Sequence, residues 1–314
     1  RDRRVTRSQA SVIVTRALRF LVALVSVASG SAFAGSGPSV SPPAGVVRLV
    51  IDGEPSHLNP LLDPDLWGYR IAHDLLCEPL VRRRPKSAAA APSGSGAGIA
   101  AEPGFEPGLA ERYRLDSDGH GIELTLRPAR FHDGRPVTAH DVRATIEMLR
   151  NAGTSAPRTQ ALLGDLVRVQ VLDSGRAGQV RLDFRRTTGD GILALLSEID
   201  ILPAHYFANG RLAHQPWNRR PVCSGPYRLS EWRRGNHIVL RRFTEYGGYS
   251  GPAPQSDELR FLIAPDRARG LALLRKGEAD LVGRVMPAYL RDQVEPAVHR
   301  GRWQSTEIDA NQII

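Results

Sequence analysis

Apolar and polar residues alternate in several short stretches of the chain, a pattern that predicts strands with one buried face. Residues 46–51 instead form a continuous apolar run rich in β-branched residues, which is typical of a fully buried strand. The remaining predicted strands lie in two hairpins, a further strand pair and a β-α-β unit, at residues 112–126, 227–240, 167–184 and 259–282.

Apolar residues recur about every 3.6 positions in several segments between these strands and predict helices. Asp63-Pro64 is expected to open a helix that carries Cys77. Thr138, with Asp141 three residues later, has the form of a capping box and predicts the start of a second helix. Because strands and helices are mixed along the whole chain, we expect an α/β architecture with mixed sheets.

Residues 1–34 have the layout of a secretory signal peptide. An arginine-rich stretch is followed by the short apolar run 20–28 and by Ala32-Phe33-Ala34, a cleavage site of the A-x-A type. The apolar run is shorter than the roughly 18–20 residues needed to cross a bilayer. We therefore expect export, cleavage near Ala34 and a soluble periplasmic protein. The alternative is an N-terminal helix that stays in the fold.

The net charge of +9 does not by itself indicate nucleic-acid binding. Residues 1–34 contain six arginines and one acid, so more than half of the excess charge belongs to the predicted signal peptide. A phosphate-binding surface needs basic residues gathered on one face, and the rest of the sequence gives no sign of such clustering. With 41% hydrophobic and 24% charged residues, the composition is that of a folded protein.

The two cysteines, Cys77 and Cys223, are too few for a disulfide scaffold. In an oxidising compartment they would pair if their Cα atoms lay within about 7 Å of each other. We expect two separate buried thiols instead, and pairing is the alternative.

The sequence contains no pattern typical of catalysis or metal binding. Cys223-Ser224-Gly225-Pro226 lacks the G-x-S-x-G frame of a nucleophile elbow and is interpreted as a tight turn entering a strand. His132 and His140 lie eight residues apart and match no metal-ligand spacing. No glycine-rich phosphate loop follows a strand. Together these absences favour a binding protein without a cofactor over an enzyme.

Six short segments carry a further signal because they occur together and in a fixed order. They are Glu54-Pro55-Ser56-His57-Leu58-Asn59-Pro60, Glu78-Pro79-Leu80-Val81, Pro107-Gly108-Leu109-Ala110-Glu111, Phe131-His132-Asp133-Gly134-Arg135-Pro136-Val137-Thr138-Ala139-His140-Asp141-Val142, Pro221-Val222-Cys223-Ser224-Gly225-Pro226-Tyr227 and Gly277-Glu278-Ala279-Asp280-Leu281. In this order they resemble the extracytoplasmic solute-binding proteins of family 5, which serve ABC importers of peptides and, in some branches, of nickel or oligosaccharides.

The resemblance implies a two-lobed periplasmic binding protein whose α/β lobes close on a ligand in the cleft between them. It divides the chain into a signal peptide at 1–34, a disordered lead-in at 35–45, lobe I at 46–261 with a low-complexity loop at 86–104, and the start of lobe II at 262–314. Members of the family are considerably longer. We therefore expect a truncated reading frame or an incomplete gene model, in which lobe II is incomplete.

The resemblance also implies which residues contact the ligand. In peptide-binding relatives the loop after the first strand lines the cleft and offers backbone groups to an extended peptide. Its counterparts here are Glu54, Pro55, Ser56 and His57, and the alternative for them is a solvated loop. The segment that reaches the cleft from lobe II corresponds to Gly283, Arg284 and Val285. The guanidinium of Arg284 would pair with a carboxylate of the ligand.

We therefore expect a monomeric substrate-binding component of an ABC importer that captures a peptide-like solute and delivers it to the permease subunits, with no catalysis, metal or nucleic acid involved. The sequence leaves open whether the ligand is a peptide, a nickel complex or an oligosaccharide. One alternative is a secreted hydrolase that uses Ser224 or Cys223. Another is a nonfunctional fragment whose incomplete second lobe leaves apolar surface exposed.

Overall fold

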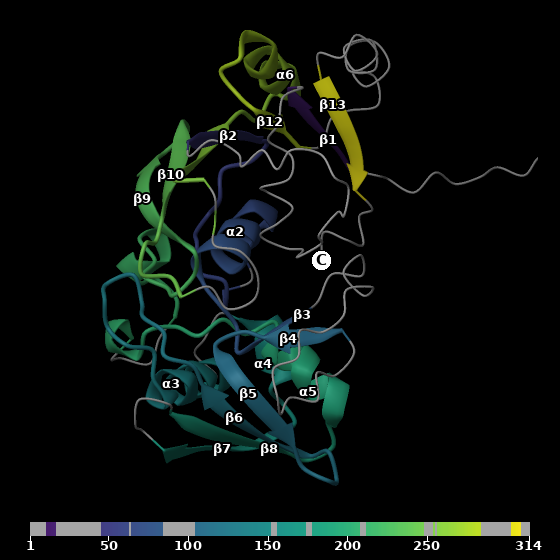
Figure 1. Cartoon of the computed structure of the whole chain (residues 1–314), viewed down its shortest axis with the longest axis vertical. Helices are drawn as coiled ribbons and strands as arrows, with labels where there is room; N and C mark the ends of the chain where they lie inside the picture. The colour runs from purple at the N-terminus through teal and green to yellow at the C-terminus, as the bar shows by residue number, and fades with distance from the viewer. Residues whose placement is uncertain are drawn as a thin grey trace, which may run out of the picture.

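The structure is a computed structural model with two main sheets, one in each half of the molecule as drawn in Figure 1. It describes residues 11–16, 45–62, 64–83, 104–151, 156–173, 178–207, 212–247, 254, 256–283 and 303–308, and for 11–16 and 303–308 it describes the backbone alone. One cluster of buried apolar side chains includes residues of both sheets, so the two halves share a core.

The sheet in the upper half of Figure 1 has seven strands in the order β13-β1-β12-β2-β11-β10-β9. Their bounds are Ser11–Arg16 for β1, Val46–Ile51 for β2, Tyr227–Arg233 for β9, His237–Arg242 for β10, Glu258–Ile263 for β11, Leu281–Val282 for β12 and Trp303–Ile308 for β13. β2 is parallel to both of its neighbours, and all other pairs are antiparallel. The predicted hairpin at 227–240 and the strand at 46–51 are confirmed, but the strand is only partly buried, because Val46 at its start is 44% exposed.

The predicted β-α-β unit is present, but its two strands are not neighbours. β11 and β12 are joined by α6 (Arg267–Lys276), and β2 lies between them. α6 begins at Asp266, whose carboxylate accepts a hydrogen bond from the N–H of Ala268 at 2.9 Å, and ends at Gly277, which has a φ of +75°. The carboxylate of Asp280 accepts hydrogen bonds from the backbone and guanidinium of Arg48, which ties the start of β12 to β2.

The sheet in the lower half has four antiparallel strands in the order β5-β6-β8-β7, covering Ala110–Leu115, Gly121–Leu126, Gln179–Phe184 and Leu166–Asp173. Helix α3 (Ala139–Arg150) packs against β7 and β8. Its predicted capping box is confirmed, because the N–H of Thr138 donates to the carboxylate of Asp141 at 2.9 Å and the hydroxyl of Thr138 accepts from the N–H of Asp141. The hairpin at 112–126 and the strand pair at 167–184 are also confirmed.

Shorter elements connect the two sheets and cover them. They are β3 (Val81–Arg83), β4 (Phe105–Pro107), α4 (Pro157–Leu162), α5 (Gly189–Leu196), and the 3₁₀-helices η3 (Ala204–Tyr206) and η4 (Pro216–Arg219).

The helix predicted from Asp63-Pro64 begins slightly later and changes its winding. α2 (Leu66–Ile71) starts at Asp65, whose carboxylate accepts a hydrogen bond from the N–H of Gly68 at 2.8 Å. It continues directly as η1 (Ala72–Leu76), a π-helical segment that ends at Cys77. π-Helical turns are rare and often occur at functional positions.

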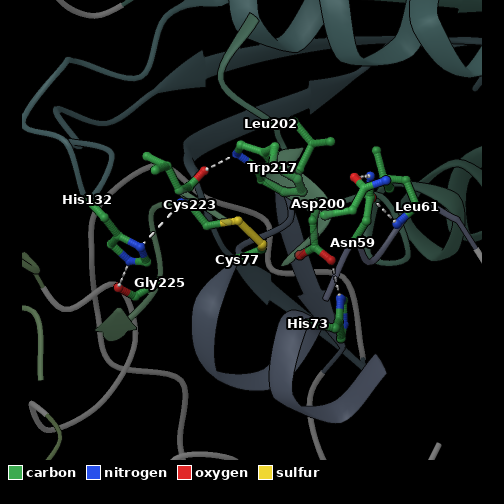
Figure 2. Close-up of a disulfide and its surroundings, with 12 residues drawn as sticks. Asn59, Leu61, His73, Cys77, His132, Asp200, Leu202, Trp217, Cys223 and Gly225 are labelled. Atoms are coloured by element: carbon green, nitrogen blue, oxygen red, sulfur yellow. Dashed lines mark hydrogen bonds and ion pairs between the residues drawn. A yellow bond between two sulfur atoms is a disulfide. The ribbon is translucent and has the colours of Figure 1, made fainter. Parts of the chain in front are cut away.

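The expectation of two separate thiols is wrong, because Cys77 and Cys223 form a disulfide (Figure 2). Their Cα atoms lie 4.8 Å apart. The end of η1 and the turn before β9 meet closely here, and the N–H of Gly225 donates to the carbonyl oxygen of Leu76 at 2.7 Å. A Cβ on Gly225 would lie 2.5 Å from that oxygen, so only glycine permits the approach. Because the two cysteines are 146 positions apart in the sequence, their proximity could not be predicted from local patterns.

Within the predicted signal peptide, the structure describes residues 11–16, which form β1 between β12 and β13. The lead-in at 35–45 and the loop at 86–104 lie outside the described residues, apart from Gly45 and Gly104. The proposed boundary between the lobes, at 261/262, falls within β11. Cleavage near Ala34 and the division into lobes remain predictions.

Candidate ligand-binding site

The loop after β2, residues 52–59, lies at the carboxyl ends of the parallel strands β2 and β12. In sheets with parallel strands, ligands bind outside the carboxyl ends of the strands. The indole of Trp67, on α2, lies beside this edge: a Cβ on Gly53 would be 3.8 Å from Cδ1 of Trp67, and one on Gly283 would be 3.7 Å from its Cη2. Trp67 donates its Nε1–H to the carboxylate of Asp52 at 2.7 Å. The loop, Gly283 and a half-buried aromatic ring therefore come together at one place.

Glu54 fastens the loop to the hairpin of β9 and β10. One of its carboxylate oxygens accepts a hydrogen bond from Nε1–H of Trp232 at 2.9 Å, and the other accepts from the N–H of Gly235 at 3.0 Å. The side chain is therefore occupied by protein donors and positions the loop. Among the described residues, none forms a hydrogen bond with the backbone N–H of Gly53 or of Glu54. These two donors are available to a ligand.

Ser56 is held through its N–H, its hydroxyl and its carbonyl oxygen. Its N–H and its hydroxyl donate to the same oxygen of Asp65, at 2.8 and 3.0 Å, and its carbonyl oxygen accepts from Arg219 at 3.1 Å. The guanidinium of Arg219 also lies 4.6 Å from the ring centroid of Trp232, a cation–π contact. Burial acts to raise the pKa of Asp65, but the hydrogen bonds from Ser56 and Gly68 outweigh it and hold the pKa below its usual value. The loop is thus fixed by charge-assisted hydrogen bonds.

His57 adds a side-chain donor to the two free backbone N–H groups of the loop. Its Nδ1 accepts a hydrogen bond from the N–H of Asn59 at 3.3 Å, which places the proton of the neutral ring on Nε2. Burial lowers the pKa of His57, and the positive charge of Arg219 acts in the same direction. The ring is therefore neutral at pH 7 and presents an N–H donor. Pro55 is buried and gives the loop rigidity without a donor of its own.

The residues expected to act from the second lobe are described only in part. Gly283 lies directly after β12, beside Trp67, while Arg284 and Val285 lie outside the described residues. Sequence reasoning did not single out Asp52, Trp67 or Arg219. Asp52 and Trp67 stand on either side of the loop in the sequence, 15 residues apart. This spacing alone does not indicate that the indole folds back onto the carboxylate.

The hydrolase alternative lacks its nucleophile. The sulfur of Cys223 is bonded to Cys77, and Ser224 is fully buried. Within the described residues, no imidazole or carboxylate forms a hydrogen bond with Oγ of Ser224, so no general base activates it.

Two histidines lie on opposite sides of the disulfide (Figure 2). His73, on η1, has its Nδ1 2.7 Å from a carboxylate oxygen of Asp200, whose side chain is completely buried. Burial acts to lower the pKa of His73, but the charge of Asp200 and the hydrogen bond to it outweigh burial and raise the pKa to about 9. His73 is therefore a cation at neutral pH, and its ring stacks on Tyr69 with centroids 4.8 Å apart.

His132 lies on the other side, near Cys223. Its Nε2–H donates to the carbonyl oxygen of Gly225 at 3.0 Å, and its Nδ1 accepts from the N–H of Cys223 at 3.2 Å. Burial lowers the pKa of His132 to about 4, so the ring is neutral. The turn that carries His132 is thereby joined to the entry of β9. Neither histidine belongs to a metal site, since no group of three or more potential ligands gathers in the described part of the chain.

No helix among the described residues is both long enough and apolar enough to cross a membrane.

Comparisons with known proteins agree on one group. A family model described as bacterial extracellular solute-binding proteins, family 5 middle, matches residues 104–306, which is more than half of the chain. The uncharacterized protein YejA of Escherichia coli (strain K12) is 31% identical over 186 residues, covering 57% of this chain and 30% of YejA. A putative ABC transporter peptide-binding protein of Brucella ovis is 27% identical over 174 residues, covering 54% of this chain and 32% of that protein.

Among solved structures, AgaA of A. tumefaciens R10, in complex with agropinic acid, superposes with a TM-score of 0.62 and 26% identity. The match covers 76% of this chain and 43% of AgaA. The chain thus spans about a third of the length of both curated relatives and less than half of AgaA. Its mixed α/β sheets are those of one part of a two-lobed periplasmic binding protein, as expected from the sequence.

Proposed function

Because the chain belongs to the bacterial extracellular solute-binding proteins of family 5, we propose that it captures a peptide-like solute and delivers it to the permease subunits of an ABC importer. Capture takes place in the periplasm after removal of a signal peptide near Ala34, a cleavage that also removes β1 from the upper sheet. The protein acts as a monomer and catalyses no reaction. The related protein of Brucella ovis is described as a putative peptide-binding protein of this transporter class, which supports the assignment.

The observation that carries the proposal is the fixed loop after β2. An extended peptide is recognised mainly through its backbone, by donors and acceptors that are already ordered before it arrives. The N–H groups of Gly53 and Glu54 and the Nε2–H of His57 are such donors, and the bonds of Glu54 and Ser56 hold the loop in place. Trp67 adds an apolar surface beside them.

The remainder of the site continues along the same sheet edge. We assign Gly283, Arg284 and Val285, which follow β12 in the sequence, to the edge of the cleft beside the loop. The guanidinium of Arg284 pairs there with a ligand carboxylate, since arginine binds carboxylates in a bidentate geometry. Closure of the two lobes buries the solute between the donors of the loop and this arginine.

Native mass spectrometry of the purified full chain tests the proposal, with a mixed pool of random tripeptides to pentapeptides as the probe. We expect one-to-one complexes with intact peptides. Glu54→Gln removes the charge that fixes the loop and should weaken binding several-fold, whereas Glu111→Gln, an exposed acid on β5, serves as the matched control and should leave it unchanged.

Two outcomes contradict the proposal. In the first, no peptide of the pool is retained by the chain. In the second, shortened peptides accumulate and Ser224→Ala stops their formation, which would establish the hydrolase instead.

A further inference from the structure

A pocket of about 300 Å³ lies between the turn that carries His132 and the strands β9 and β10. Its lining combines apolar, cationic and polar side chains: His132, Asp133, Pro221, Val222, Arg228, Leu229, Ser230 and Arg241. None of these residues belongs to the loop at 52–59, so the pocket is separate from the candidate site for the transported solute.

Two arginines of the lining stand directly opposite each other. Arg228 on β9 and Arg241 on β10 are register partners in an antiparallel pair, so their side chains emerge on the same face of the sheet. Like charges in directly opposed positions destabilise a strand pair. Both side chains are exposed, so solvent screens part of this repulsion, and a negative charge between the guanidinium groups would relieve the rest.

The protein itself supplies little of that charge. Within the described residues, the guanidinium of Arg228 forms no hydrogen bond or ion pair. Arg241 has its Nε 3.7 Å from Glu258, but that carboxylate is held more closely by Arg260, at 2.7 Å, and 63% of the Arg241 side chain is exposed. The pair is thus left with an excess of positive charge at the pocket.

The other polar groups of the lining offset only part of this charge. Burial lowers the pKa of His132 to about 4, so its ring adds no charge of its own. The carboxylate of Asp133 sets one negative charge against the two arginines; one of its oxygens lies 2.8 Å from Nε2 of His205, and the other accepts from the N–H of Arg135 at 3.1 Å. The lining therefore keeps a net positive charge. Pro221, Val222 and Leu229 give the pocket an apolar wall that a bare inorganic anion would not use.

We propose that this pocket is a second ligand site, which takes a small carboxylate with a short apolar body. The carboxylate lies between Arg228 and Arg241, and the apolar body packs against Val222 and Leu229. Arginine pairs with carboxylates through charge-assisted hydrogen bonds, and an amphipathic ligand uses both kinds of lining. Binding there stabilises the hairpin of β9 and β10, to which Glu54 fastens the loop.

Fluorine NMR of the full chain tests the site, with 4-fluorophenylacetate as the probe and the uncharged 4-fluorophenylacetamide as its isostere. We expect saturable binding of the carboxylate and at least tenfold weaker binding of the amide. Arg228→Gln and Arg241→Gln should each weaken binding about tenfold, as expected for loss of one charge-assisted contact. Arg112→Gln, an exposed arginine on β5, is the control and should have no effect.

Thermal unfolding gives a second readout. Without the probe, Arg228→Gln should raise the melting temperature because it removes the repulsion across the strand pair, and added probe should stabilise the wild-type chain but not this variant. The proposal is overturned if the amide binds as well as the carboxylate, if inorganic phosphate binds more tightly than either, or if Arg228→Gln leaves binding unchanged. It is also overturned if the peptide pool displaces the probe, because the probe would then occupy the solute site.

Discussion

His73 and His132 lie on the two sides of one disulfide, and burial has opposite outcomes for them (Figure 2). His73 faces the buried carboxylate of Asp200 and has a pKa of about 9. The hydrogen bonds of the His132 ring go to backbone groups of Cys223 and Gly225, and its pKa is about 4. Burial disfavours the charged form of both rings, so the presence or absence of a bonded carboxylate is the main reason that only His73 carries a proton. The difference shows that a buried imidazole is protonated where a carboxylate lies beside it, as for His73, and is neutral where only backbone groups bond to it, as for His132.

The largest expected effect on the free energy of unfolding comes from removing the disulfide between Cys77 and Cys223. The two cysteines are 146 positions apart in the sequence. In the chain-entropy model, a disulfide that closes a loop of this length stabilises the folded protein by about 5 kcal/mol. Cys77→Ala with Cys223→Ala should therefore lower the free energy of unfolding by about that amount, and dithiothreitol should have the same effect on the wild type. Urea unfolding in both redox states measures it. If reduction leaves the unfolding midpoint unchanged, the disulfide carries no stability.

The next largest effect is expected on the His73 side. Asp200→Asn leaves a buried cation without its counter-charge, and breaking a buried ion pair in this way costs about 3–5 kcal/mol. The pKa of His73 should fall well below 9, because burial is then opposed only by the weaker effects of Asp74 and Glu198. NMR titration of the imidazole protons and urea unfolding at pH 7 measure the two changes. Asp190→Asn, an exposed acid on α5, is the control. A pKa of His73 that stays near 9 in Asp200→Asn would rule out this assignment of its partner.

The two histidines should also give the stability opposite dependences on pH. The pKa of His132 is lowered on folding, so its contribution is complete above pH 6.5 and is lost as the pH falls toward 4. The pKa of His73 is raised, so its contribution is complete below pH 6.5 and is lost as the pH rises through 9. Each shift corresponds to about 3 kcal/mol.

We therefore expect maximal stability near pH 6.5, measured as the free energy of unfolding between pH 4 and 10. His132→Asn should flatten the acid side of this profile and leave the alkaline side intact. A flattened alkaline side in that variant would show that the two histidines do not act independently.

The smallest effect is expected at Asp74, the neighbour of His73 in η1. Its charge also raises the pKa of His73, but by less than the charge of Asp200 does. Asp74→Asn should lower the pKa of His73 slightly and change the stability by less than about 1 kcal/mol, as for an ion pair without a hydrogen bond. His132 should titrate as in the wild type. A drop in the pKa of His73 as large as that in Asp200→Asn would mean that the two carboxylates contribute equally.

The features predicted correctly from the sequence are those that short segments determine by themselves. The capping box of Thr138 and Asp141 is formed within one helical turn, and the hairpin at 112–126 is set by its own alternation and turn. The position of β2 between β11 and β12 could not be predicted in this way, because the pairing joins segments more than 200 residues apart. The same holds for the disulfide, whose geometry depends on a glycine contact across the fold.

The candidate site was predicted through the resemblance rather than from local chemistry. Glu54, Ser56 and His57 lie in one loop, and the roles of Glu54 and Ser56 in fixing that loop depend on Trp232, Gly235 and Asp65. Nothing in the sequence of the loop reveals those partners. Asp52 and Trp67 were missed for the same reason, since an indole has no preferred carboxylate until the fold supplies one.

The disulfide also determines how the chain would respond to a protease. Every strand of the four-stranded sheet lies between residues 77 and 223, and every strand of the seven-stranded sheet lies outside that interval. The whole lower sheet is thus carried on a covalently closed ring, and the two covalent connections of this ring to the rest of the chain meet at the disulfide. A cut anywhere within the ring leaves one molecule of unchanged mass, apart from the added water, and the pieces separate on reduction alone. The ring therefore tolerates a break in its main chain that would divide an open chain in two.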